Sequence, residues 1–410
     1  MQHSIQKVNK ESSTKQSMTG ALAWVFAVCS GLSVANIYYA QPLLDSIALE
    51  FHLSTATIGL VITITQICYA LGLLLLVPLG DLVNRRKLIL IQMILSASAL
   101  IVVGTSASSS ILFSAIAMVG LLAVITQTFV AYAAHLSADS QRGSIVGRVT
   151  SGIVIGILLA RSVAGLMNDW LGWRSVYLFS ASLTLISVFV LGRMLPQGSF
   201  KQSKLGYLQL LASTLRLYKE LHVLRIRGLL AMLIFMAFSI LWTAIVLPLS
   251  APPISLSHAA IGAFGFAGLA GALAAAKAGK LADHGSGQTT TGISLIILVL
   301  SWIPTSLLHT SLWFLVVGVI LLDLAVQAVH VTNQSLIYQV RPEAQSRLTA
   351  SYMIFYSIGS AVGSIISTQV YAWSGWRGVC LLGTGVSITA LLVWIVDLLS
   401  ERFVLARRDR

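Results

Sequence analysis

A line of polar side chains runs through a strongly apolar stretch of this sequence, and side chains of these types can carry protons. Asp323 is followed at +4, +7 and +11 by Gln327, His330 and Gln334. At 100° per residue of an α-helix the four fall within about 60° of one another, so they form one stripe. A carboxyl group in a low-dielectric environment binds a proton more readily than in water, and histidine titrates near neutral pH. The stripe therefore predicts a proton carrier at Asp323 and, at His330, either a proton relay or a hydrogen-bonding wall residue.

Arg161 supplies a fixed positive charge inside a second apolar stretch, because a guanidinium keeps its proton in proteins. A charge at the centre of a bilayer costs about 2.5 to 3.5 kcal/mol on insertion scales, so a charged residue in such a place is a candidate for function. Three roles remain open for Arg161. It could hold an anionic substrate, form an ion pair with Asp323, or hold the protein in one conformation.

Aromatic and amide side chains in other apolar stretches could complete a pocket around these charges. We expect a substrate cavity lined by Asn36, Tyr39, Gln127, Arg161, Trp242, Gln327 and Tyr356. Gln41, Gln66 and Tyr352 are further candidates of the same kind. Each uncharged member could instead be a residue that only packs between helices.

The apolar stretches that carry these residues have the length of membrane spans. Apolar residues make up 57% of the 410 residues and charged residues 10%, whereas a soluble domain has about a quarter charged. A spanning helix needs about 20 apolar residues. Twelve such stretches are expected, near 19–43, 56–79, 88–106, 110–135, 146–168, 175–195, 228–250, 259–279, 290–308, 311–336, 348–372 and 378–398. The chain is predicted to be an all-α polytopic membrane protein.

The second half of the chain repeats the first. Leu53, Ser54, Ala56, Ile58 and Gly59 reappear as Leu256, Ser257, Ala259, Ile261 and Gly262, and Gly172-Trp173-Arg174 reappears as Gly375-Trp376-Arg377, all at an offset of 203. Asp81 has a counterpart at Asp283. Two parallel six-helix repeats are typical of secondary transporters, whose substrate site lies between the repeats near the bilayer midplane.

The basic residues predict the orientation of the chain. If the amino terminus is cytoplasmic, 23 of the 26 Lys and Arg residues lie on the inner side, and Arg161, Arg174 and Arg377 are the others. The positive-inside rule then places both termini in the cytoplasm. We expect a tail (1–18), a six-helix half (19–195), a basic, membrane-skimming linker (196–227), a second half (228–398) and a second tail (399–410). This bias explains the net charge of +13 without a nucleic-acid partner.

Signatures of enzymes are missing from the sequence. It has no Gly-rich phosphate loop, HExxH motif or nucleotide-binding domain, so we expect no enzyme activity, no cofactor and no metal site. Cys29, Cys68 and Cys380 all fall in apolar spans without paired spacing and are interpreted as packing residues. The expected partners are a small-molecule substrate, protons and membrane lipid, and the protein is expected to function as a monomer.

These residues resemble the major facilitator superfamily, over essentially everything from Ala21 to Leu399. The family's loop after the second span is matched by Leu79, Asp81, Arg85 and Arg86, although Val77, Leu82 and Asn84 depart from it. The copy in the second half is Gly279-Lys280-Leu281-Ala282-Asp283, without the basic end. The resemblance implies a cytoplasmic gate that involves Asp81 and Asp283, with Arg85 and Arg86 either gating or holding the loop on the inner side.

The fifth span resembles the family's antiporter motif more closely. Gly147, Gly156, Ala160-Arg161 and Ala164-Gly165 stand at the motif's spacing, with Arg161 in the place of its proline. Small residues on one face allow close helix contact, and in the family they seal the two halves, which implies gating roles for Gly156 and Gly165. The arginine that many proton-coupled members carry in the fourth span is missing, since no Lys or Arg lies between Lys87 and Arg142.

The resemblance therefore implies a proton-linked exporter of a small amphipathic solute, most similar to drug:proton antiporters, in a bacterial cytoplasmic membrane. The alternative is an importer of a small organic anion or metabolite, a proton symporter or uniporter, with Arg161 as the counter-charge. A non-transporting sensor would be expected to carry an appended domain, and the tails here have only about 18 and 12 residues.

Overall fold

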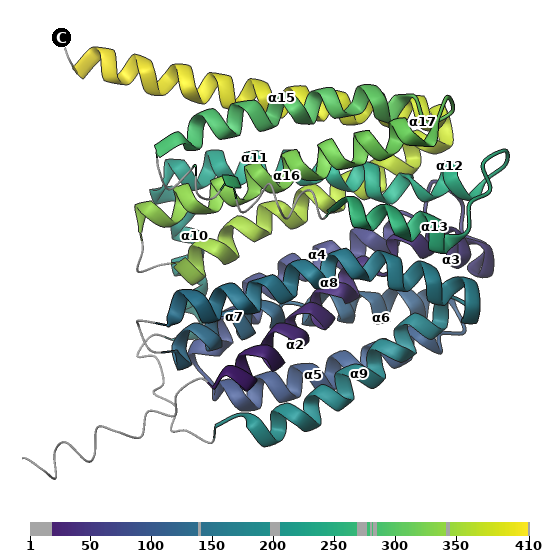
Figure 1. Ribbon diagram of the computed structural model, residues 1–410. Helices are drawn as coiled ribbons and strands as arrows, with labels where there is room; N and C mark the ends of the chain where they lie inside the picture. The colour runs from purple at the N-terminus through teal and green to yellow at the C-terminus, as the bar shows by residue number, and fades with distance from the viewer. Residues whose placement is uncertain are drawn as a thin grey trace, which may run out of the picture.

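The computed structural model describes residues 19–137, 141–196, 206–268, 277–278, 281, 285–341 and 345–408, and every regular element in these ranges is a helix (Figure 1). A helix satisfies its backbone hydrogen bonds internally, as a segment in lipid must. Ten helices among the described residues are long and apolar enough to cross a membrane. The chain is therefore an all-helical, multi-pass membrane protein, as its composition predicts.

The first half of the chain forms one helical bundle and the second half another (Figure 1). The elements of the first are α2 (Gly20–Tyr38), η1 (Gln41–Leu43), α3 (Leu44–Phe51), α4 (Leu60–Leu75), η2 (Val77–Asp81), α5 (Arg85–Gly104), α6 (Ser109–Leu122), α7 (Ile125–Leu136), α8 (Arg142–Leu171) and α9 (Trp173–Met194). The second contains α11 (His222–Ala244), α12 (Val246–Ser250), α13 (His258–Ala263), η3 (Phe264–Ala267), α15 (Gly287–Ser306), α16 (Leu312–Val340) and α17 (Gln345–Arg408). The helix α10 (Tyr207–Glu220) falls in the expected linker.

The ten spanning helices correspond to the twelve expected stretches with two differences. The stretch from Arg347 to Ser400 counts once although it covers two expected spans, because α17 is interrupted by non-helical backbone at Gly375. The eighth expected span begins at α13 and η3 and continues mostly outside the described residues. A total of twelve therefore stays a prediction.

The repeated Gly-Trp-Arg segment marks the same turn in both halves. Gly172 has φ +79° and Gly375 has φ +60°, and each lies between two successive helical stretches. A positive φ is readily adopted only by glycine, which explains why glycine occupies both places. Five other helices among the described residues begin at side-chain caps, in which an oxygen accepts a backbone N–H. These caps are Thr19, Asn84, Ser108, Ser257 and Ser311.

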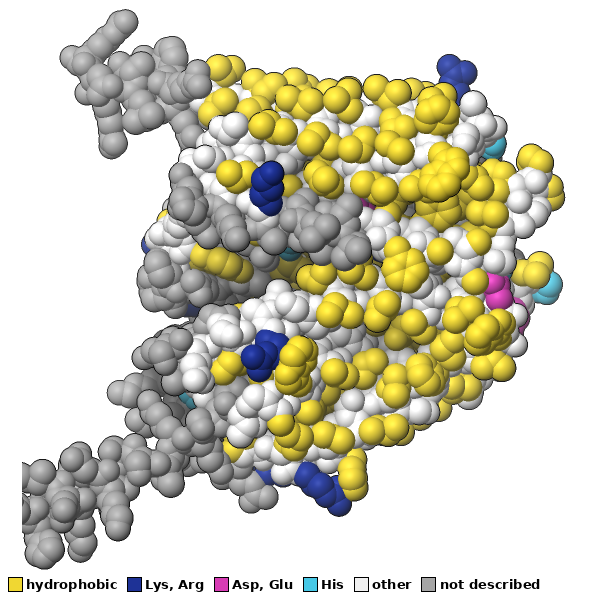
Figure 2. Space-filling model, viewed as in Figure 1, with side chains coloured by type: hydrophobic (Ala, Val, Ile, Leu, Met, Phe, Trp, Pro, Cys, Tyr) yellow, Lys and Arg dark blue, Asp and Glu magenta, His cyan; other side chains and the backbone are white. Residues whose placement is uncertain are grey.

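Hydrophobic side chains cover most of the visible face between the two ends of the molecule (Figure 2). Many large ones are well exposed, including Trp24, Ile186, Phe189, Ile303 and Val396. An apolar surface of this extent marks a partner or a membrane. We call the end at which α2 begins and α17 ends the inner end, following the predicted orientation. The opposite end, with α3 and the α12–α13 connection, is the outer end (Figure 1).

Within each bundle, glycine allows one close helix contact that the repeat reproduces. Gly156 of α8 lies against the backbone of Gly31 in α2. Gly359 of α17, at an offset of 203 from Gly156, lies against the backbone of Met232 in α11. Dispersion contacts between closely packed helices stabilise association in a membrane, where lipid is as apolar as the side chains.

The two bundles meet along a seam in which glycines again face backbone. Gly59, just before α4, lies against Ser364 and Thr368 of α17, and Gly262 of α13 lies against Arg161 and Ser162 of α8. Gly59 and Gly262 are equivalent in the repeat, and so are Arg161 and Ser364. The repeat seen in the sequence thus builds two related contacts between the halves, and one of them contains Arg161.

We expect Gly359→Ala to destabilise the protein and Gly385→Ala, in the part of α17 beyond Gly375, to leave it as stable or stabilise it. A Cβ at Gly359 would overlap the Met232 backbone, whereas nothing lies within 4 Å of one at Gly385. Overpacking costs roughly 1 to 3 kcal/mol, and an unhindered Gly-to-Ala change in a helix gains about 0.5 to 1 kcal/mol. Thermal unfolding of both variants in the same detergent would measure the difference, and equal melting temperatures would contradict the close contact.

Candidate functional site

Two opposite charges lie buried in the seam, with the indole of Trp242 between them. Trp242 of α11, Arg161 of α8 and Asp323 of α16 are each no more than 3% exposed. The indole Nε1 donates a hydrogen bond of 3.0 Å to Asp323 Oδ1. Arg161 Cζ lies 3.7 Å from the centroid of the same ring. Trp242 therefore offers its positive edge to the carboxylate and its negative face to the guanidinium, which is the favourable arrangement for both.

Arg161 and Asp323 do not form a direct ion pair. Both residues are described, and no N–O distance between them is within 4 Å. The only hydrogen bond of Asp323 to the described residues is the one from Trp242. Toward the described residues the carboxyl group therefore has further oxygen lone pairs that can accept a hydrogen bond or a proton.

The guanidinium of Arg161 is held in place but is not saturated with acceptors. Its Nε donates to Gln41 Oε1 at 2.7 Å, and the rings of Tyr38 and Phe238 lie 5.2 and 5.3 Å from Cζ. Its Nη2 is buried and has no hydrogen-bond partner among the described residues. Next to it lies a cavity of about 10 Å³ lined by Gln41, Pro42, Arg161, Trp242, Ile245 and Ile261, which is room for about one water molecule. A buried N–H without an acceptor costs about 1 to 3 kcal/mol, so this group favours an added acceptor.

An aromatic cluster continues from the buried charges and also joins the halves. The hydroxyl of Tyr38 in α2 lies 2.6 Å from that of Tyr356 in α17. The ring of Phe235 packs edge-on against both Tyr356 and His330, at centroid distances of 4.0 and 5.1 Å. His330 Nδ1 lies 3.0 Å from the hydroxyl of Tyr352. The cluster thus connects Tyr38 of the first half with His330, two helical turns along α16 from Asp323.

The predicted stripe on α16 extends from the buried charges into less buried surroundings. Asp323 is buried, whereas Gln327, His330 and Gln334 are half-buried. Gln327 and Gln334 have no hydrogen-bond partner among the described residues. Amide groups in this position can bind a polar solute or water.

The remaining expected cavity residues have different neighbours. Asn36 and Tyr39 are buried against α9, where Ser180 donates a 2.7 Å hydrogen bond to Asn36 Oδ1 and Tyr177 packs edge-on against Tyr39. Gln127 is half-buried on α7. The structure therefore brings Arg161, Trp242 and Tyr356 together with Asp323, and it places Asn36 and Tyr39 in a packing contact within the first half.

The expected gating residues divide between the two ends of the molecule. Arg85 Nε donates to the carbonyl of Gly80 within the loop at 2.9 Å, whereas Arg86 donates to the carbonyl of Gly192 in α9 and so holds the loop to its own half. Asp81 ends η2, and nothing is described of its side chain; Asp283 lies outside the described residues. Gly156 packs within the first half, whereas Gly165 lies against the His258 carbonyl of the second half.

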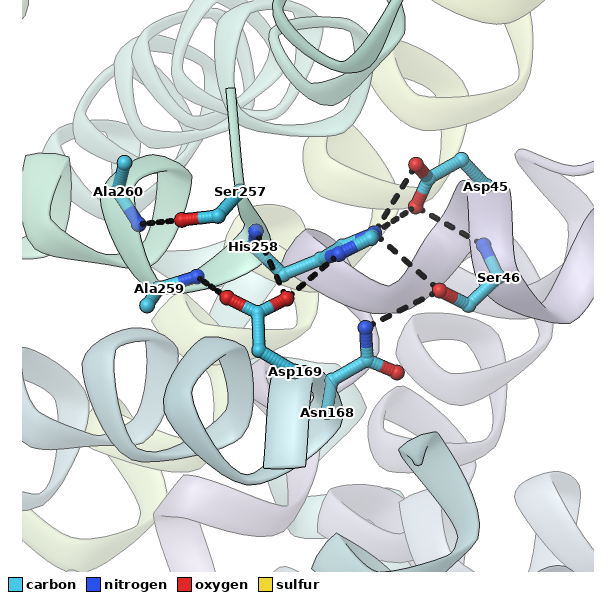
Figure 3. A network of polar contacts seen from close by, with 8 residues as sticks. All are labelled: Asp45, Ser46, Asn168, Asp169, Ser257, His258, Ala259 and Ala260. Atoms are coloured by element: carbon cyan, nitrogen blue, oxygen red, sulfur yellow. Dashed lines mark hydrogen bonds and ion pairs between the residues drawn. The ribbon is translucent and has the colours of Figure 1, made fainter. Parts of the chain in front are cut away.

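The sequence interpretation missed two groups of residues in the seam. Tyr38 contacts Arg161 and Tyr356. Because Tyr38 stands three residues before Gln41, the side chains of Tyr38 and Gln41 lie on one side of the chain. At the outer end, Asp45 and Asp169 of the first half both contact His258 of the second (Figure 3). One signal was available for this contact: His258 is a mismatch inside the repeated segment, where its equivalent is Thr55.

Comparison with known proteins agrees with this architecture. The family model described as Major Facilitator Superfamily matches residues 24–284 and 227–403. The chain is 44% identical to "Uncharacterized transporter YgaY" of Escherichia coli O157:H7, over 92% of this chain and 95% of that protein. It is 26% identical to "Inner membrane transport protein YnfM" of Escherichia coli (strain K12), over 88% and 86%.

Solved structures show the same fold. A bacterial homolog of the human lysosomal transporter Spinster, in an inward-facing and unoccupied conformation, aligns with a TM-score of 0.76 at 13% identity and covers 94% of this chain and 97% of its own. The human organic anion transporter MFSD10 aligns with a TM-score of 0.65 at 17% identity, over 92% and 100%. With a family model that matches nearly the whole chain and a transporter 44% identical to it, this protein belongs to the major facilitator superfamily of membrane transporters.

Proposed function

We propose that this transporter is a proton-linked secondary carrier that exports a small amphipathic solute, with Asp323 as the proton carrier. The observation that supports this most directly is the contact of Asp323, Trp242 and Arg161 in the seam. The solute would bind between the halves, against the aromatic cluster of Tyr38, Phe235 and Tyr356 and the amide of Gln327. Such a site combines apolar surface with a few polar groups, as sites for amphipathic ligands do.

Protonation of Asp323 would change the forces in the seam. The ionised carboxylate accepts a charge-assisted hydrogen bond from Trp242 and balances part of the Arg161 charge. The protonated acid accepts a weaker bond and leaves the guanidinium charge uncompensated. Because Arg161 belongs to one half and Asp323 and Trp242 belong to the other, this change would favour one arrangement of the halves over another.

Transport would follow from alternating access, in which the two halves rock about the central site. In the arrangement described here the halves are in contact at the outer end through Gly165 and His258 and through Gly59 and Ser364. Opening toward the outer side would separate these contacts. The bacterial relatives and the distribution of basic residues support a place in a bacterial inner membrane with both termini in the cytoplasm, and we expect a functional monomer.

One observation favours a second candidate, an importer of a small organic anion. Arg161 Nη2 is buried without a partner among the described residues, beside a small cavity. A carboxylate oxygen would satisfy this donor with a charge-assisted hydrogen bond. The two candidates differ in the direction of flux and in the charge of the solute.

Asp323→Asn is expected to abolish proton-driven transport. The amide has nearly the same shape and can accept the Trp242 hydrogen bond, but it cannot take up and release a proton. Inverted vesicles with an acidic interior and a pH dye would show whether compounds from a chemically broad panel release lumenal protons. Asp397→Asn is the matched control, because Asp397 of α17 has no hydrogen bond or ion pair with the described residues. Unchanged proton release by the Asp323 variant would contradict the proposal.

Gly165→Ala is expected to shift the protein toward an outward-open arrangement. A Cβ at Gly165 would overlap the His258 backbone of the other half, whereas nothing lies within 4 Å of one at Gly147 in the same helix. Spin labels at Leu49→Cys and Trp373→Cys, which are 80% and 78% exposed on opposite halves, would report the separation of the outer ends. A longer distance in Gly165→Ala but not in Gly147→Ala is expected, and identical distances would exclude a gating role for Gly165.

Arg161 variants separate the two candidate functions. If Arg161 binds an anionic solute, Arg161→Gln should lose the transport currents that organic carboxylates evoke, and Arg161→Lys should keep part of them, because it retains the charge but not the planar fork. Matched neutral amides are the control solutes, and currents on a solid-supported membrane are the readout. Carboxylate currents that persist in Arg161→Gln would rule out the anion importer.

A further inference from the structure

The outer ends of the two halves are joined by a histidine that lies between two carboxylates (Figure 3). His258 begins α13 in the second half. Its Nε2 lies 2.9 and 3.0 Å from the two carboxylate oxygens of Asp45 in α3, and its Nδ1 lies 3.0 Å from Asp169 Oδ1 in α8. Both carboxylates therefore belong to the first half, on opposite sides of the imidazole.

Only the protonated imidazole can donate a hydrogen bond from both ring nitrogens. A neutral imidazole would leave one nitrogen lone pair facing a carboxylate lone pair, which is repulsive. The two carboxylates are the charged groups in contact with the ring among the described residues, and no cation faces it there. The hydroxyl of Ser46 lies 3.2 Å from Nε2 and accepts a hydrogen bond from Asn168 Nδ2. The surroundings thus select the cationic form of His258.

Asp169 is held as an acceptor independently of the imidazole. Its two carboxylate oxygens accept the backbone N–H groups of His258 and Ala259, at 3.1 and 2.8 Å. These bonds also cross from one half to the other. Asp169 is therefore in place to receive the protonated ring whenever the outer end is closed.

The site is open to the outer solution and has no counterpart in the other repeat. The side chains of His258, Asp45 and Asp169 are 20%, 23% and 22% exposed, so protons can reach them. The positions equivalent to His258 and Asp169 at the offset of 203 are Thr55 and Ala372, neither of which titrates. The ionisable contact is therefore an addition to one of the two related seam contacts and not a requirement of the fold.

We propose that His258, Asp45 and Asp169 form a proton-binding site at the outer end, and that the bound proton holds the two halves together there. The site is distinct from Asp323. Separation of the outer ends would break it, because this movement removes both carboxylates from the imidazole. A proton from the outer solution thus stabilises the outward-closed arrangement. This inference rests on the proposed alternating access, but it depends neither on the solute nor on a proton at Asp323.

The direction of the pH dependence follows from linkage. Hydrogen bonding to Asp45, opposed by desolvation, raises the pKa of His258 above its usual value of 6.5 in the closed arrangement. In the open arrangement the ring has lost these partners and should titrate near its ordinary pKa of about 6.5. The stabilisation of the closed arrangement by protonated His258 is therefore fully present below the ordinary pKa of about 6.5. It is lost as pH rises through the raised pKa that His258 has in the closed arrangement.

Distance measurements between spin labels at Leu49→Cys and Trp373→Cys would test the site, in protein whose three native cysteines are replaced by alanine. In lipid nanodiscs the outward-closed population should fall between about pH 5.5 and about pH 8.5, a range that brackets the ordinary histidine pKa. His258→Gln should abolish this pH response, and Asp45→Asn should move its midpoint to lower pH. His309→Gln is the matched control, because His309 is exposed in the turn between α15 and α16 and has no partner among the described residues.

Two further variants distinguish proton binding at this site from misfolding and from the proposed role of Asp323. His258→Arg carries a permanent charge and should keep the outer end closed without a pH response. The same measurements in Asp323→Asn should retain the response that depends on His258. A response that is equal in wild type and His258→Gln, or missing in wild type, would overturn the inference, whatever Asp323→Asn does to proton-driven flux.

Discussion

Two opposite charges are buried between the halves of this transporter, and the indole of Trp242 contacts both while keeping them apart. A direct ion pair between Arg161 and Asp323 would be difficult to break, because separating bare charges in a low-dielectric interior is costly. Contact through a neutral aromatic ring retains part of the attraction. It also lets either charge move or change without the breaking of a direct ion pair. The contact joins α8, α11 and α16 at the seam, because each of these helices contributes one of its members.

Composition and apolar length were sufficient to predict an all-helical membrane protein. Apolar length predicts the spans, and the offset of 203 shows that the two halves are repeats. That the repeated Gly59 and Gly262 make equivalent contacts between the halves became visible only in the structure. Arg161 and Asp323 were identified as buried charges because charge is rare in apolar spans. Their connection through Trp242 was not predictable, because it depends on the rotation of three helices that the sequence does not place relative to one another.

Other contacts could not be placed from the sequence for the same reason. Helical periodicity could not decide between Tyr38 and Tyr39, which are adjacent in sequence and have different neighbours: Tyr38 contacts Arg161 and Tyr356, whereas Tyr39 packs on Tyr177. Asp45 and His258 are separated by more than two hundred residues and lie outside the apolar cores of their spans. Their proximity follows from the closure of the outer end, a tertiary property, and only the mismatch between His258 and Thr55 hinted at it.

The glycine contacts along the seam have a consequence for how such a protein can diversify. Gly59, Gly165 and Gly262 each face main-chain atoms of the opposite half, mostly carbonyl groups. Every amino acid presents the same carbonyl, so the fit of these surfaces is insensitive to the identity of most residues they touch. Side chains of the touched residues, such as Arg161, can therefore be exchanged while these backbone contacts keep their shape. A seam built on main-chain contacts thus leaves the chemistry of the side chains beside it free to change.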